Sequence, residues 1–187
     1  MDNFLNLIKL FSGTMIIKKD LIILLFIVLG VLTRIIPHVD NFTAVYAIAL
    51  FSGSLLKNKK IVALLIPIYI MGISDLILNT SMNISVYISL SFIVLLGFYF
   101  KKYKNITNII SYSIVSSLIF FLITNFSVWL SSTPADGVYY CSQDLIGFTK
   151  CYIQAIPFFW PTLISTVSYS LILFYSFELI RDLSIIK

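Results

Sequence analysis

Charged residues are scarce in this sequence, and their scarcity argues against a soluble protein. Only 11% of the 187 residues are charged, whereas 59% are hydrophobic, and the mean hydropathy is +1.01. A soluble domain of this length could not cover so much apolar surface with so few charges. We therefore expect an integral membrane protein, with no room for a second, soluble domain.

Several chemical signatures are also missing. The single histidine cannot complete a familiar zinc set. No Gly-x-x-x-x-Gly-Lys loop occurs, so any ATP-driven step would need other subunits. No paired carboxylates support acid–base catalysis. The net charge of +5 comes from lysines clustered between apolar runs, which is typical of membrane orientation and not of nucleic-acid binding.

Residues 1–19 are expected to form an interfacial amphipathic segment ahead of one transmembrane domain, residues 20–187. Phe4, Leu7 and Phe11 recur at helical spacing with polar residues between them. A signal peptide is the alternative. However, no small-x-small cleavage site follows the first apolar run, so we expect the segment to be retained.

The apolar runs predict an all-α bundle of six transmembrane helices. The expected spans are 21–36, 41–56, 61–79, 85–100, 109–131 and 151–179. The first, second and fourth are short for a bilayer core about 30 Å thick, which needs about 20 helical residues. Either flanking residues extend these spans, or the local bilayer is thin.

Basic residues alternate between the predicted loops and orient the bundle. They cluster before span one, between spans two and three, between spans four and five, and after span six: Lys18 and Lys19; Lys57, Lys59 and Lys60; Lys101, Lys102 and Lys104; Arg181 and Lys187. The intervening loops contain one lysine in all. Because positive loops stay in the cytoplasm, both termini are predicted to be cytoplasmic.

On the opposite side of the membrane, Arg34 and Asp75 fall at similar heights on spans one and three. Charged groups at membrane depth are expensive and usually mark a site. The two could form a structural ion pair that fixes helix register, or they could hold a ligand. Arg34 could also extend its side chain to the outer interface.

The corner after the first span contains three notable residues. Pro37 must end the span. Asn41 is well placed to cap the second span. His38 could ligate a metal, although a lone histidine at an interfacial turn is more often a capping or hydrogen-bonding residue.

The fifth span places Asn125 and Trp129 four residues apart, on one helix face near the outer surface. Since an amide must be satisfied in lipid, this face should point into the bundle. The two residues are therefore candidates for ligand binding.

The sixth span opens with Pro157 and Pro161, which are expected to kink or break the helix. Broken helices at membrane depth often line ligand sites. The neighbouring aromatic residues either pack on a flat ligand or face lipid: Phe158, Phe159 and Trp160.

Cys141 and Cys151 both fall on the outer side, and three states stay open: a disulfide, a thiol ligand to a soft metal or cofactor, or two inert thiols. The long loop 132–150 between spans five and six is typical of a lid or a binding loop. Ala49 and Gly53 would allow close helix approach, for internal packing or for docking a partner.

Several blocks of the sequence look like an uncharacterised family of small bacterial inner-membrane proteins. They are Arg-Ile-Ile-Pro-His at 34–38, Asn-Phe-Thr at 41–43, Ala-Ile-Ala-Leu-Phe-Ser-Gly at 47–53, Ser-Asp-Leu at 74–76, Phe-Phe with Thr-Asn and Trp at 120–129, and Cys-Tyr with Ala-Ile-Pro-Phe-Phe at 151–159. The resemblance covers roughly 34–177. It implies a bacterial inner-membrane location but carries no activity.

The architecture resembles the S-components of energy-coupling-factor vitamin transporters. These have six helices, cytoplasmic termini and a pocket open to the outside. They commonly dock a transmembrane partner through an alanine-x-x-x-alanine pattern on the first helix, which is absent here. Solitary cobalamin-transporting S-components are a further relative to consider. In that case His38 or a cysteine would face cobalt, although no diagnostic motif supports a cobalamin-like ligand and no cofactor is predicted.

The leading hypothesis is a substrate-binding protein, not an enzyme, for uptake of a vitamin-like small molecule or cofactor precursor. Its partners would be the lipid bilayer, the ligand and separate transmembrane and ATPase subunits. The predicted ligand-binding residues are Arg34, His38, Asn41, Asp75, Asn125, Trp129, Cys151, Phe158, Phe159 and Trp160. Two alternatives stay open: a membrane enzyme using His38, Asp75 or Cys151 at the outer face, and an assembly subunit that binds no ligand.

Overall fold

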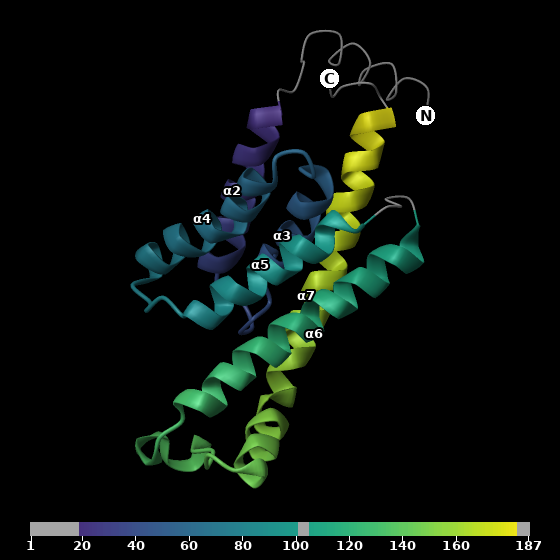
Figure 1. Ribbon diagram of the computed structural model, residues 1–187. Helices are drawn as coiled ribbons and strands as arrows, with labels where there is room; N and C mark the ends of the chain where they lie inside the picture. The colour runs from purple at the N-terminus through teal and green to yellow at the C-terminus, as the bar shows by residue number, and fades with distance from the viewer. Residues whose placement is uncertain (1–18, 101–104, 183–187) are drawn as a thin grey trace.

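A computed structural model describes residues 19–100 and 105–182, and over these ranges all regular elements are helices (Figure 1). The helices are α2 Lys19–Ile35, α3 Val45–Leu55, α4 Lys60–Leu78, α5 Ile84–Phe98, α6 Ile106–Ser131, the short 3-10 helix η1 Pro134–Tyr139, and α7 Leu145–Asp182. The predicted all-α class is confirmed. Of the amphipathic segment predicted for residues 1–19, residues 1–18 lie outside the described residues, and Lys19 is the first residue of α2.

Three of these helices are long and apolar enough to cross a membrane: α4, α6 and the Leu145–Leu179 part of α7. The others are shorter, with 17 residues in α2, 11 in α3 and 15 in α5. At about 1.5 Å per residue, α3 covers only about 17 Å. Flanking residues do not lengthen it, because residues 41–44 form a turn and the helix ends at Leu55.

The short helix α3 forms the centre of the bundle. Every residue from Val45 to Ser54 is buried, and α3 packs against α2, α4, α5, α6 and α7. Phe51 shows how the packing works, since its ring lies 5.2 Å from that of Phe26 on α2 and 4.8 Å from that of Phe174 on α7. A helix that is apolar on all sides is expected at such a central position.

Glycines allow α3 and α5 to cross closely. A Cβ atom on Gly53 would overlap the carbonyl of Val94, and one on Gly97 would overlap the carbonyl of Leu50. The small residues Ala49 and Gly53 therefore serve internal packing, one of the two roles left open by the sequence.

Helices α6 and α7 form a hairpin that extends well beyond the ends of the shorter helices (Figure 1). Helix α7 begins at Leu145, ahead of the predicted start, and continues through Pro157 and Pro161, so of the predicted kink or break the break is absent. Each proline removes only one backbone hydrogen bond, and the bonds on either side together with packing on α6 keep the helix continuous.

Candidate functional site

Arg34 and Asp75 form an ion pair between the last turn of α2 and the last turn of α4. The Arg34 Nη1 atom lies 2.7 Å from Asp75 Oδ1. Arg34 Nη1 also donates to the hydroxyl of Ser74 and, at 3.4 Å, to the carbonyl of Met71. The Asp75 side chain is 5% exposed and that of Arg34 18% exposed. The pairing predicted from helical rise is thus present.

Both oxygens of the Asp75 carboxylate accept hydrogen bonds from protein donors. Its Oδ2 atom accepts from the Tyr87 hydroxyl of α5 at 3.0 Å, and its Oδ1 atom accepts from Thr80 at 3.2 Å as well as from Arg34. These bonds tie α2, α4 and α5 together at one end. Asp75 itself lines neither of the two cavities described below. Its contacts therefore favour the structural role that the sequence left open.

Arg34 keeps part of its guanidinium unused. All its hydrogen bonds within the described chain leave from Nη1, so Nε and Nη2 donate to no described protein group. A guanidinium has five N–H donors, and the atoms left over can bind a further acceptor while the pair with Asp75 stays intact.

A cavity of about 550 Å³ opens beside Arg34. This volume is within the range of small-molecule sites, about 300–1,000 Å³. The wall combines polar residues from the end of α2 and the turn before α3 with apolar residues from α3 to α7. It consists of Arg34, His38, Asp40, Asn41, Thr43, Val45, Tyr46, Met71, Leu78, Val86, Phe120 and Phe158.

A second cavity of about 230 Å³ adjoins the first. The two share four lining residues: Asn41, Val86, Phe120 and Phe158. The smaller cavity is completed by residues of α6 and α7: Phe121, Thr124, Asn125 and Thr162. Because they share these walls, we treat the two spaces as one candidate site between the short helices and the α6–α7 hairpin.

Asn41 does not cap α3, contrary to the sequence prediction. The N-cap position is Ala44, whose N–H donates to the Thr33 hydroxyl at 3.2 Å, and the Val45 N–H donates to Thr43 at 3.4 Å. Asn41 instead adopts a left-handed backbone conformation with φ of 64°, which asparagine tolerates in turns. The turn places it on the walls of both cavities.

Asn125 and Trp129, predicted to act together, lie in different surroundings. Asn125 lines the smaller cavity. Trp129 reaches the hairpin tip, where its Nε1 donates to the Ser142 carbonyl at 2.9 Å and its ring packs on Phe148. Four residues on a helix amount to about 6 Å, enough to carry Trp129 past the cavity.

Three other predicted ligand residues also lie away from both cavities. Trp160 is 56% exposed, Phe159 packs on Phe121 with ring centroids 5.1 Å apart, and Cys151 is part of the hairpin tip. Of the aromatic residues predicted on the sixth span, only Phe158 lines the site. Consecutive residues of a helix point about 100° apart, so one of three neighbours can face a given cavity.

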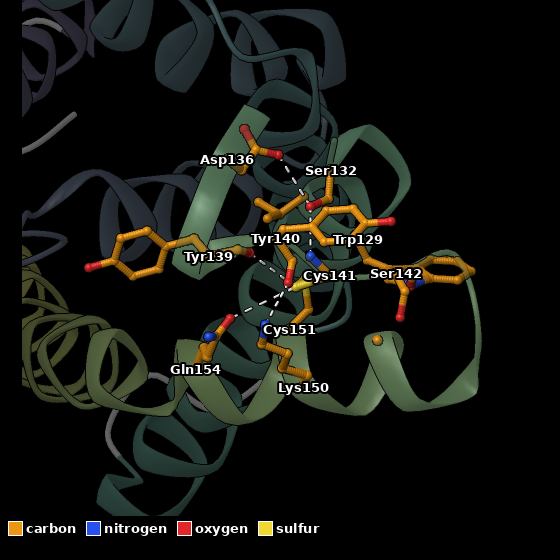
Figure 2. The surroundings of a disulfide bond; sticks show 12 residues. Trp129, Ser132, Asp136, Tyr139, Tyr140, Cys141, Ser142, Lys150, Cys151 and Gln154 are labelled. Carbon is orange, nitrogen blue, oxygen red and sulfur yellow. Dashed lines mark hydrogen bonds between the residues drawn. A yellow bond between two sulfur atoms is a disulfide. The ribbon is translucent and has the colours of Figure 1, made fainter. Parts of the chain in front are cut away.

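The hairpin tip is fastened by a disulfide between Cys141 and Cys151, shown in Figure 2. Two side chains of α7 add to this link, since Lys150 Nζ donates to the Tyr140 carbonyl at 2.7 Å and Gln154 Nε2 to the Val138 carbonyl at 3.3 Å. No residue of 132–150 lines either of the two cavities. The loop is therefore attached to the start of α7, and the lid role stays a prediction.

The disulfide also removes the thiol chemistry considered from the sequence. Neither cysteine is a free thiol. Among the described residues, no three His, Cys, Asp or Glu side chains gather as a metal site would require. His38 is exposed and lies on the wall of the larger cavity.

Sequence inspection missed several lining residues. Tyr46 was inconspicuous inside an apolar run, but it is buried on α3 and faces the larger cavity. Thr124 and Thr162 each follow a lining phenylalanine by four residues. The sequence could have indicated these two threonines, because each lies one helical turn after a phenylalanine and therefore on the same helix face.

Residues 14–185 match a family model described as a family of unknown function, DUF6580, and the chain belongs to this family. No curated protein and no solved structure matches it.

Proposed function

We propose that this member of the family is a membrane-embedded binding protein for the uptake of a small molecule, held in the two adjoining cavities beside Arg34. One observation carries the proposal: Arg34 is balanced by Asp75, keeps N–H donors that no described protein group accepts, and lines a cavity of ligand size. A buried ion pair with a purely structural role needs no such cavity. Intramembrane charges beside one are usually functional.

The hairpin tip is proposed to face the extracytoplasmic side. Disulfides persist in oxidising compartments, and the Cys141–Cys151 bond is at the tip. The Lys19 end of α2 and the Asp182 end of α7 lie together at the opposite end of the molecule (Figure 1). This agrees with the lysine distribution, which independently favours cytoplasmic termini and six spans.

An S-component type of uptake is the form of transport that fits these features. The bundle supplies a ligand site but the sequence has no nucleotide-binding loop, so energy would come from separate subunits. An outer-face enzyme is less well supported, because Cys151 is not a free thiol and the Asp75 carboxylate is occupied by three donors.

Native mass spectrometry of the gently solubilised full chain tests this proposal. We expect a small molecule to be retained by the wild type and by Trp160→Ala, the matched control, because Trp160 lies away from both cavities. Arg34→Gln should lose it, since the cavity wall loses its charged donor. Circular dichroism establishes that each variant is folded.

Two outcomes would contradict the proposal. A wild type that carries a partner protein and no small molecule would support the assembly alternative. A small molecule retained equally by the wild type and by folded Arg34→Gln would place the site elsewhere.

A further inference from the structure

Resting on the proposed function, we infer that the ligand has an acceptor group such as a single carboxylate at one end, a nitrogen–hydrogen donor at the other, and a flat apolar body between. Some hydrogen-bonding atoms of the lining side chains are already bonded within the protein, and the remaining ones indicate which groups a ligand would need.

The larger cavity presents donors. Arg34 directs Nη1 to Asp75, Ser74 and the Met71 carbonyl, which leaves the Nε and Nη2 hydrogens for a ligand. A planar guanidinium edge suits a carboxylate, because two parallel N–H groups can contact two oxygens.

The charge on this wall disfavours a ligand with more than one negative charge. Among the described residues that line the wall, Arg34 is the only arginine or lysine, and its charge is already balanced by Asp75 at 2.7 Å. Asp40 adds a further carboxylate to the same wall. A phosphate dianion would bring two negative charges with little compensation, which is costly away from water.

The smaller cavity presents acceptors. The hydroxyls of Thr124 and Thr162 donate to carbonyls of their own helices, at 2.8 Å and 3.1 Å. Asn125 Nδ2 donates to the Phe121 carbonyl at 2.8 Å, and because a carbonyl only accepts, this bond fixes the amide orientation. The Thr124 and Asn125 oxygens keep lone pairs available, whereas the Thr162 side chain is also hydrogen-bonded to the Tyr46 side chain. This end therefore suits a donor on the ligand.

Apolar side chains join the two ends. Phe120, Phe158 and Val86 line both cavities. Aromatic rings favour stacked or edge-on contact with a flat apolar group. A ligand that spans both spaces would place such a group between the donor wall and the acceptor wall.

Three matched probes test this arrangement with the purified full chain in nanodiscs, by isothermal titration calorimetry. The first probe, 3-(4-aminophenyl)propanoate, carries both end groups on a phenyl ring. The second, 4-ethylaniline, lacks the carboxylate. The third, 3-(4-dimethylaminophenyl)propanoate, lacks the N–H donor. We expect the first probe to bind at least about tenfold more tightly than either of the others, as one lost charged or buried hydrogen bond predicts.

Two variants assign each preference to its wall. Arg34→Gln should remove the preference for the carboxylate and keep the preference for the N–H group. Asn125→Leu should remove the preference for the N–H group and keep the preference for the carboxylate. Trp160→Ala should keep both, since it lies outside the site.

The outcomes separate this inference from the proposed function. Equal binding of all three probes would overturn the inference and leave a binding protein. Absence of binding by every probe up to about 1 mM, an affinity weaker than about 4 kcal/mol, would also overturn it. The proposed function would then still stand if the wild type retains a co-purified molecule that Arg34→Gln loses.

Discussion

At the scale of single residues, Asp75 determines how the charge on Arg34 is tolerated. Its carboxylate accepts from a guanidinium on α2, a hydroxyl on α5 and a hydroxyl in the turn after α4. Hydrogen bonding to both oxygens compensates for burial of the charged pair. The unused edge of Arg34 is available for a ligand because Asp75 occupies only one nitrogen of the guanidinium.

Removing the charge of Asp75 should therefore destabilise the protein. We expect Asp75→Asn to lower the free energy of unfolding by about 2–4 kcal/mol, because Arg34 is left without its counter-charge. The double variant Arg34→Gln/Asp75→Asn should lose less than the sum of the two single variants. Denaturant unfolding in mild detergent measures all four proteins. Strictly additive losses would show that the pair is not coupled.

The stability of the hairpin tip is expected to depend on pH through Asp144. The Gly147 N–H and the Ser142 hydroxyl both donate to its Oδ1 atom at 2.7 Å, and these bonds hold the pKa of Asp144 below its ordinary value of 3.8. A lowered pKa means that the folded state favours the carboxylate. Its contribution to stability is full above pH 3.8 and is lost as the pH falls through the folded-state pKa.

Hydrogen exchange of the Gly147 amide can measure this effect. We expect Asp144→Ala to exchange this amide faster than the wild type at neutral pH, because the start of α7 loses its acceptor. The difference should shrink as the carboxylate is protonated in acid. A difference that stays constant down to the lowest pH at which the protein is folded would contradict this account.

At the scale of elements, the α3–α5 crossing holds the core together. The two helices pack with backbone against backbone, because Gly53 faces the Val94 carbonyl and Gly97 faces the Leu50 carbonyl. Close approach of this kind maximises van der Waals contact, which drives helix association in membranes. The crossing also fixes where Tyr46 and Val86 meet the cavities.

Two glycine-to-alanine substitutions test the crossing against an internal control. Gly53→Ala should lower stability by about 3 kcal/mol or more, since the added methyl would force the helix backbones apart. Gly72→Ala on α4 meets nothing within 4 Å and should be neutral or stabilising by up to about 1 kcal/mol. Thermal unfolding of the two variants in detergent compares them. Similar losses in both would show that helix contact is not the cause.

At the scale of the whole molecule, the α6–α7 hairpin makes the two ends of the protein structurally different. The tip is closed by the disulfide, whereas the Lys19 end of α2 and the Asp182 end of α7 lie at the far end (Figure 1). The site lies between these ends, where the short helices stop and the hairpin continues.

Cysteine labelling on intact cells tests the proposed orientation. In a Cys141→Ser/Cys151→Ser background, a cysteine replacing exposed Val138 at the tip should react with a membrane-impermeant maleimide. A cysteine replacing exposed Asn58, between α3 and α4, should react only after permeabilisation. The reverse pattern would invert the bundle and place the disulfide in the cytoplasm.

Helix positions were largely predictable because each depends on a local run of apolar residues. The predicted third span, 61–79, differs by one residue at each end from α4, and the fifth ends at Ser131 as predicted. The start of α3 was missed, because Thr33 and Thr43 supply hydroxyl groups to its first turn and Asn41 does not. A contact from the preceding helix leaves no local signal at the capping position.

The sequence by itself determined the all-helical class with its long apolar helices, and it placed Arg34 and Asp75 at similar heights where they could pair. The length of an apolar run depends only on neighbouring residues and indicates where a helix lies. The helical rise per residue then gives the height of each side chain along that helix. Only the tertiary structure decided which side chains share the cavities, since Phe158 faces them and Trp160 does not. That choice depends on how helices distant in the chain cross, and the α3–α5 and α6–α7 contacts that set it lie far outside any local sequence pattern.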